Sequence, residues 1–122
     1  MHQAAIVCHS EWVIMELLWE RPRTLTELVK ELREPAGWTK STVATMVRRM
    51  AEKGSIHYTM QGRAKLFIPT ISRDYVSLLE TKALLKRAYQ GRPGLLIDAL
   101  AKANALSPAD IDEICQILKT AK

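Results

Sequence analysis

The stretch Trp38–Gly54, WTKSTVATMVRRMAEKG, has the pattern of one amphipathic helix with clear ends. Apolar side chains recur every three or four positions along it, which is the spacing of a buried stripe on a helix. Thr39 can begin the helix and Gly54 can end it, so the pattern predicts a helix from about Thr39 to about Lys53. The expected buried stripe comprises Trp38, Val43, Met46, Val47 and Met50.

Two strand-like runs follow this helix. Residues 56–60 and 66–71 are rich in β-branched and aromatic side chains, and the residues between them, QGRAK, contain a glycine. These are the signals of a β-hairpin. Its turn, residues 61–65, is expected to carry two positive charges, Arg63 and Lys65, at the tip of the hairpin.

Two shorter helical patterns precede the long helix. The first spans residues 12–19, with Ser10 as its N-cap, and residues 21–23 (RPR) end it. Thr24, with Glu27 three residues later, forms a capping box that opens the second helix. Three helices followed by a hairpin with a basic tip are the layout of a winged helix-turn-helix.

Helical patterns with apolar faces recur towards the end of the chain, over residues 72–90, 95–100 and 107–118. Three such helices cannot bury their apolar faces well against one winged helix, and a symmetric dimer is the economical solution. We therefore expect this part of the chain to form a dimer interface. The side chains expected in that interface are Leu79, Leu84, Tyr89, Leu96, Leu100, Ile111, Ile114, Cys115 and Leu118.

The expected fold class is mainly α with a small β-hairpin, a winged helix-turn-helix over residues 1–71 followed by a C-terminal helical dimerisation region over residues 72–122. A length of 122 residues with 48% hydrophobic residues suits a compact globular unit.

No apolar run approaches the roughly 18–20 residues that span a bilayer, and the first residues lack the pattern of a signal peptide. Cys8 and Cys115 form no CxxC motif, so we expect reduced thiols in a cytoplasmic protein.

Positive charge is concentrated in the middle of the chain. Residues 38–65 hold six basic side chains and one acid, Glu52, whereas residues 1–37 hold four basic and six acidic side chains. A localised basic segment is typical of a polyanion-binding surface, although a solvated face has the same composition. Hydroxyl side chains can bind phosphates or base edges, and basic side chains can bind phosphates, although N-capping is an alternative role for Thr39. The candidate DNA-binding side chains are Thr39, Lys40, Ser41, Thr42, Thr45, Arg48, Arg49, Arg63 and Lys65.

Other polar residues carry weaker signals. Thr24 and Thr26 begin a helix, and we interpret them as caps rather than DNA contacts, while the amides of that helix N-terminus remain an alternative contact to a phosphate. His2, Cys8 and His9 lie near one another in sequence, but their spacing fits no zinc pattern, so we expect no metal and no cofactor. The chain contains no nucleophile elbow, no Gly-rich phosphate loop and no HExxH motif, which argues against an enzyme.

Four stretches resemble the penicillinase-repressor family of bacterial regulators. Residues 10–19, SEWVIMELLW, are similar to the first helix of that family. Residues 38–54 match its second signature, a Trp, a Ser/Thr-rich helix start and a closing Arg-hydrophobe-x-x-Lys-Gly. The resemblance continues through residues 88–91 and 107–118. It is closer to the β-lactamase and methicillin-resistance repressors than to the copper-responsive members, because Cys115 stands alone where the latter have a CxC motif.

The resemblance implies a homodimeric repressor that binds double-stranded DNA at an inverted-repeat operator until an inducing signal releases it. It also implies a partner, a membrane β-lactam sensor with a metalloprotease domain. Asp98-Ala99 corresponds to the Asn-Phe bond that is cleaved in methicillin-type members, and is the candidate proteolytic site. A ligand-responsive activator or sensor and a winged-helix protein-interaction module are the alternative interpretations.

Overall fold

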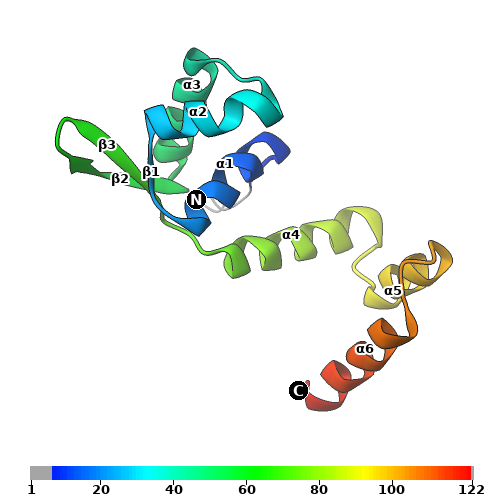
Figure 1. Ribbon diagram of the computed structural model, residues 1–122. Coiled ribbons are helices and arrows are strands. Elements are labelled where there is room, and N and C mark those ends of the chain that lie inside the picture. Colours follow the sequence, from blue (N-terminus) through cyan, green and yellow to red (C-terminus); the bar gives the residue numbers. More distant parts are fainter. Residues whose placement is uncertain (1–6, 122) are drawn as a thin grey trace. The chain divides into compact units, whose positions relative to one another are not determined.

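The computed structural model describes residues 7–121, which form six helices and one three-stranded sheet (Figure 1). This confirms the mainly α fold class. The chain divides into two compact units between Glu80 and Thr81, inside the fourth helix, and the domain boundary expected after residue 71 stays a prediction. The elements are α1 (His9–Glu20), β1 (Arg23–Thr24), α2 (Leu25–Ala36), α3 (Lys40–Lys53), β2 (Ile56–Gln61), β3 (Ala64–Pro69), α4 (Arg73–Ala88), α5 (Pro93–Lys102) and α6 (Pro108–Thr120).

Local capping signals set the ends of α2 and α3. Thr24 Oγ1 accepts a hydrogen bond from the Glu27 amide at 3.3 Å, and Glu27 Oε1 accepts one from the Thr24 amide at 2.8 Å, which confirms the predicted capping box. Helix α3 begins after its N-cap Thr39 and ends at Gly54, as predicted. Gly54 has φ of 92°, a conformation that glycine adopts without a steric penalty.

The start of α1 differs from the prediction. Its N-cap is Cys8, and Ser10 lies inside the helix. The Cys8 amide donates a hydrogen bond to Glu11 Oε1 at 3.3 Å, and Lys53 Nζ at the end of α3 donates to the same oxygen at 2.8 Å. Ser10 as N-cap is therefore wrong, because the acid that completes the cap lies three residues after Cys8.

The hairpin turn is shorter than the sequence indicated. Gln61 of β2 pairs with Ala64 of β3, so only Gly62 and Arg63 form the turn. Gly62 has φ of 64°, which favours glycine at the first position of a two-residue hairpin turn. Lys65 consequently lies in strand β3, and its expected place in the turn is wrong.

A short strand that the sequence did not signal completes the sheet. Strand β1 pairs antiparallel with β3, with Arg23 opposite Phe67 and Thr24 opposite Leu66, and the strand order is β1-β3-β2. Because β1 has only two residues, it shows no alternating pattern that could predict it. The middle of β3 is thereby joined to the segment between α1 and α2.

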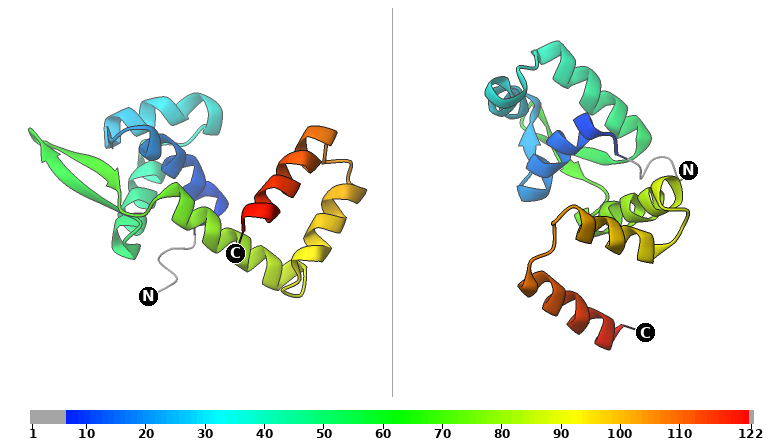
Figure 2. Two further views of the ribbon diagram at one scale, coloured as in Figure 1. Left: turned by 90° about the horizontal axis from the view of Figure 1, so that it is seen from below. Right: turned by 90° about the vertical axis from the view of Figure 1, so that its right-hand side faces the viewer.

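The core of the first unit lies among α1, α2, α3 and the base of the sheet, and the hairpin projects from these helices (Figures 1 and 2). The predicted stripe of α3 is confirmed, with Trp38 and Met46 half-buried and the other three members buried. The buried apolar side chains of these elements are Ile14, Met15 and Leu18 of α1, Leu28 and Leu32 of α2, Val43, Val47 and Met50 of α3, Ile56 of β2 and Phe67 of β3.

Arg23 is a buried cation that joins several of these elements, with 3% of the residue exposed. Its guanidinium donates to Glu20 Oε1 at 2.7 Å and to Glu31 Oε1 of α2 at 2.8 Å. It also donates to the main-chain carbonyls of Leu17 and Arg21, at the end of α1. The partial negative charge of a helix C-terminus favours a cation there. One side chain therefore holds the end of α1 against α2.

The beginning of α4 belongs to the first unit. Trp19 Nε1 donates a hydrogen bond to the Ile71 carbonyl at 2.9 Å, and the Val76 side chain is fully buried. Arg73 forms an ion pair with Glu16 of α1, and its hydrogen bonds lower the pKa of the Glu16 carboxyl. These contacts attach the chain that follows the sheet to α1.

The second unit has well-defined helix starts but no buried side chain between residues 81 and 121. Ser107 and Asp110 form a capping box at α6, which confirms the predicted start. Among the expected interface residues, Ile111, Cys115 and Leu118 are exposed in the single chain. The others are half-buried: Leu79, Leu84, Tyr89, Leu96, Leu100 and Ile114.

The candidate proteolytic site lies within α5. Asp98 is exposed and forms an ion pair with Lys102 at 2.8 Å, one helical turn later, and Ala99 is half-buried. Both residues are therefore in regular helical backbone. Within residues 7–121, no helix combines the length and apolar character that crossing a membrane requires.

Replacing Arg23 with Met should lower the free energy of unfolding of the first unit by about 2–4 kcal/mol, because Glu20, Glu31 and two helix-end carbonyls each lose a charged donor. The measurement is urea unfolding followed by tryptophan fluorescence, since Trp12, Trp19 and Trp38 all lie in this unit. Arg21→Met is the matched control, expected to cost less than about 1 kcal/mol, because Arg21 is half-exposed and weakly paired. Equal small losses for both variants would contradict the role of Arg23.

Candidate nucleic-acid interface

Most of the polar side chains predicted to bind DNA share one side of α3, opposite its buried stripe. Helical spacing separates Ser41, Arg48 and Arg49 from Val43, Val47 and Met50, which pack into the core. Lys40, three residues before Val43, instead lies beside α2. Thr45 lies on this polar face and is half-buried. The exposed members of the predicted set are Lys40, Ser41, Thr42, Arg48 and Arg49.

Hydroxyl groups cluster at the start of α3. Thr39 Oγ1 accepts a hydrogen bond from the Thr42 amide at 3.3 Å and lies 3.1 Å from Thr42 Oγ1. Thr39 is thus an N-cap, one of its two predicted roles. Both hydroxyls are exposed, and the helix N-terminus adds amide donors that favour an anion. Phosphate contact by Thr39 stays a prediction.

The two arginines of α3 differ in their partners. Arg48 Nη1 lies 3.5 Å from Glu52 Oε2, one turn along the helix, and both side chains are more than half exposed. An exposed pair of this kind contributes little stability and is easily exchanged for another anion. Arg49 has no carboxylate within 4.0 Å in the described chain. Its guanidinium is therefore available to an anionic ligand.

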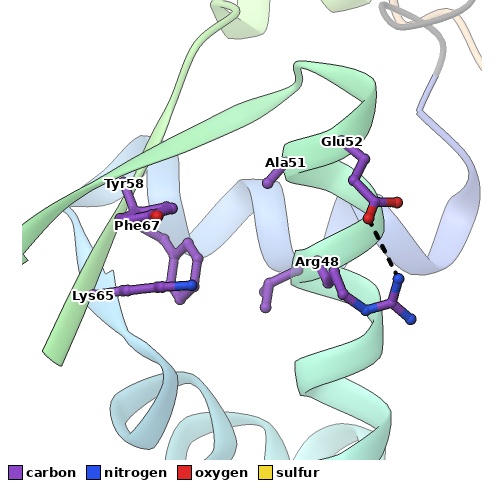
Figure 3. A pocket seen from close by; sticks show the side chains of 7 residues that line it. Arg48, Ala51, Glu52, Tyr58, Lys65 and Phe67 are labelled. Atoms are coloured by element: carbon purple, nitrogen blue, oxygen red, sulfur yellow. Dashed lines mark hydrogen bonds and ion pairs between the residues drawn. The ribbon is translucent and has the colours of Figure 1, made fainter.

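A groove of about 350 Å³ separates the second half of α3 from the hairpin. Lys65 Nζ lies 4.5 Å from the centre of the Tyr58 ring, and that ring makes an edge contact with Phe67. Figure 3 shows these hairpin side chains on one side of the groove and the Arg48–Glu52 pair on the other. Since cation–π contacts orient an ammonium group, Lys65 is held beside the groove.

The cations of residues 7–80 divide into two groups by their partners. One group forms ion pairs with carboxylates and consists of Arg21, Arg23, Arg48, Lys53 and Arg73. The other group has no carboxylate within 4.0 Å among the described residues and consists of Lys30, Arg33, Lys40, Arg49, Arg63 and Lys65. We call the second group the unpaired cations. All of them lie on α2, α3 or the hairpin.

Two of the unpaired cations, Lys30 and Arg33, are not among the residues predicted from the sequence to bind DNA. Net charge counted along residues 1–37 hid them, because that segment is acidic as a whole. The structure shows that Glu31 of the same helix is occupied by Arg21 and Arg23. Helical spacing could have revealed the pair, since both positions lie away from the apolar stripe of α2.

A second cavity, of about 380 Å³, adjoins the tip of the hairpin. It is lined by the start of α2 and by the first residues of β3, including Thr26, Arg63 and Lys65. Thr24 is confirmed as a cap, whereas the exposed Thr26 makes no capping hydrogen bond among the described residues, so its expected role as a cap is wrong. The hairpin tip and the start of α2 therefore present one continuous surface.

The group of His2, Cys8 and His9, considered above as a metal site, lies partly outside the described residues. His2 lies outside the described residues, and Cys8 and Cys115 are exposed free thiols. Within the part of the chain that the structure describes, no three His, Cys, Asp or Glu side chains are grouped to hold a metal ion.

Known proteins are similar to the chain along nearly its whole length. The family model described as "Penicillinase repressor" matches residues 7–120. The penicillinase repressor of Bacillus licheniformis is 28% identical over 118 residues, which cover 95% of this chain and 91% of that protein. The penicillinase repressor of Staphylococcus aureus is 24% identical over 110 residues, covering 89% of this chain and 87% of that protein.

A solved structure is similar to part of the chain. The solution structure of the DNA binding domain of the repressor BlaI matches with a TM-score of 0.52 and 26% identity, covering 57% of this chain and 85% of that one. The similarity supports the winged-helix fold built from α1–α3 and the hairpin. With the family model spanning both units, this chain belongs to the penicillinase repressor family.

Proposed function

We propose that this chain is a cytoplasmic transcriptional repressor that binds an inverted-repeat operator in double-stranded DNA as a homodimer. The observation that carries the proposal is the grouping of the unpaired cations on α2, α3 and the hairpin, while the other cations of the first unit are neutralised. A polyanion gains most from cations that have no internal partner. The family and the similarity to the DNA binding domain of BlaI support the same ligand.

Helix α3 and the hairpin have separate tasks in this proposal. The hydroxyl and basic side chains of α3 enter the major groove, where Thr45 and Arg49 reach base edges. Arg63 and Lys65 of the hairpin bind the adjacent phosphate backbone, which supplies affinity without sequence information. Arg48 exchanges its weak pair with Glu52 for a phosphate. Occupation of the promoter by the protein then blocks transcription.

The second unit supplies the dimer. No side chain of residues 81–121 is buried in the single chain, and large apolar side chains such as Ile111 and Leu118 are exposed. Exposed apolar helix faces of this kind mark an interface, and a two-fold dimer matches an inverted repeat.

Release is proposed to follow cleavage at Asp98-Ala99 by a membrane sensor with a metalloprotease domain. This cleavage requires local unfolding of α5, because both residues are helical.

The double variant Arg63→Ala and Lys65→Ala should weaken binding to all DNA sequences alike. The slope of log affinity against log salt should fall by about 1.8, since each lost phosphate contact removes about 0.9. Fluorescence anisotropy with a fragment of the protein's own promoter measures this. Lys82→Ala with Lys86→Ala on α4 removes the same charge and should leave the slope unchanged. Wild-type affinity that does not change with salt would refute the phosphate contacts.

Thr45→Ala and Arg49→Ala should each change the preference among operator sequences. A side chain that contacts a base edge favours the correct base over another by about 1–3 kcal/mol of binding free energy. Among competing fragments with single base changes in a half-site, each variant should therefore no longer distinguish the bases at one position. The measurement is competition binding with a panel of such fragments. A uniform loss of affinity across the panel would instead assign both side chains to phosphates.

Wild-type chain should sediment as a dimer of twice 13.8 kDa at micromolar concentration, and Leu118→Glu should sediment as a monomer. A charge on the exposed apolar side chain of α6 opposes burial in an interface. Gln116→Glu adds the same charge at an exposed polar position of the same helix and should remain dimeric. A monomeric wild type would contradict the dimer. Tryptophan fluorescence should remain native in both variants, because all three tryptophans lie in the first unit.

A further inference from the structure

A cavity of about 380 Å³ between α2 and the start of α3 has no role in the function proposed so far. It is lined by Thr26, Val29, Lys30 and Arg33 of α2 and by Lys40 of α3. The α2 residues are spaced by three or four positions and so share one face of the helix. The cavity is thus built from the outward side of α2 and the first residue of α3.

All three cations of this cavity belong to the unpaired cations. Lys30, Arg33 and Lys40 are exposed, and none has a carboxylate within 4.0 Å in the part of the chain that the structure describes. Two acids of α2 are engaged elsewhere, since Glu27 accepts from the Thr24 amide and Glu31 pairs with Arg23. The third, Glu34, forms no ion pair within 4.0 Å with these cations among the described residues. Three like charges around one cavity repel one another unless an anion joins them.

The position of the cavity indicates which anion it receives. Thr26 lines both this cavity and the cavity at the hairpin tip, where Arg63 and Lys65 lie. Lys40 is also the first residue of α3, beside the hydroxyl cluster. The cations of α2 therefore lie between the hairpin and the N-terminus of α3, along the surface that DNA would cover.

We infer that this cavity binds a backbone phosphate of the operator, next to the bases that α3 contacts. The inference rests on the proposed function and deepens it, because it adds Lys30 and Arg33 to the DNA-binding surface. The two side chains donate charged hydrogen bonds to phosphate oxygens, together with Lys40 and the Thr26 hydroxyl. Their contact positions the protein on the duplex and carries no base preference.

The test is the double variant Lys30→Ala and Arg33→Ala, bound to a fragment of the protein's own promoter. Both side chains are exposed and alanine favours a helix, so the first unit should stay folded by tryptophan fluorescence. The salt slope of log affinity should fall by about 1.8. Affinity should decrease equally for all half-site variants. In ethylation interference, ethylation of at least one phosphate should weaken binding of the wild type but leave binding of the variant unchanged.

Lys82→Ala with Lys86→Ala is again the charge-matched control and should leave the interference pattern unchanged. If the wild type binds its promoter with a steep salt dependence but the Lys30/Arg33 variant matches it in slope and interference, the inference is wrong and the proposed function stands. A change confined to particular base pairs would place the two side chains on bases and would also overturn it. A wild type that does not bind promoter DNA would instead overturn the proposed function.

Discussion

The arrangement of the proposed DNA-binding surface depends on one buried cation, Arg23. Its guanidinium holds Glu20, Glu31 and the last carbonyls of α1, while its backbone pairs with Phe67 of β3. Phe67 and Val47 of α3 both line the groove. Arg23 therefore joins α1 and α2 to the strand that borders this groove.

The start of α2 and both ends of α3 could be predicted because they are encoded locally. Thr24, Thr39 and Gly54 act on their own backbone neighbours, so three or four residues of sequence contain the whole signal. The role of Arg23 could not be predicted, since Phe67 lies far along the chain and a strand of two residues has no periodicity. Lys65 was misplaced for a related reason, because only pairing across the hairpin decides where its turn begins.

The sequence predicted the candidate DNA-binding residues of α3, but it did not indicate those of α2. Along the sequence, a charge is counted with its neighbours, and the acids of residues 1–37 concealed Lys30 and Arg33. In three dimensions five of those six acids form ion pairs with other cations, for example Glu16 with Arg73 and Glu31 with Arg23. These acids of the first unit therefore form ion pairs between its own elements. The cations on α2, α3 and the hairpin stay unpaired and are available to a polyanion.

We expect two copies of this surface to bind one inverted repeat. Hydroxyl-radical footprinting of the wild-type protein on its own promoter can show this binding mode. The footprint should contain two equivalent protected stretches, related by the symmetry of the repeat, with centres about 34–36 Å or a multiple of that distance apart. A single asymmetric stretch, or protection that spreads evenly along the fragment, would contradict this binding mode.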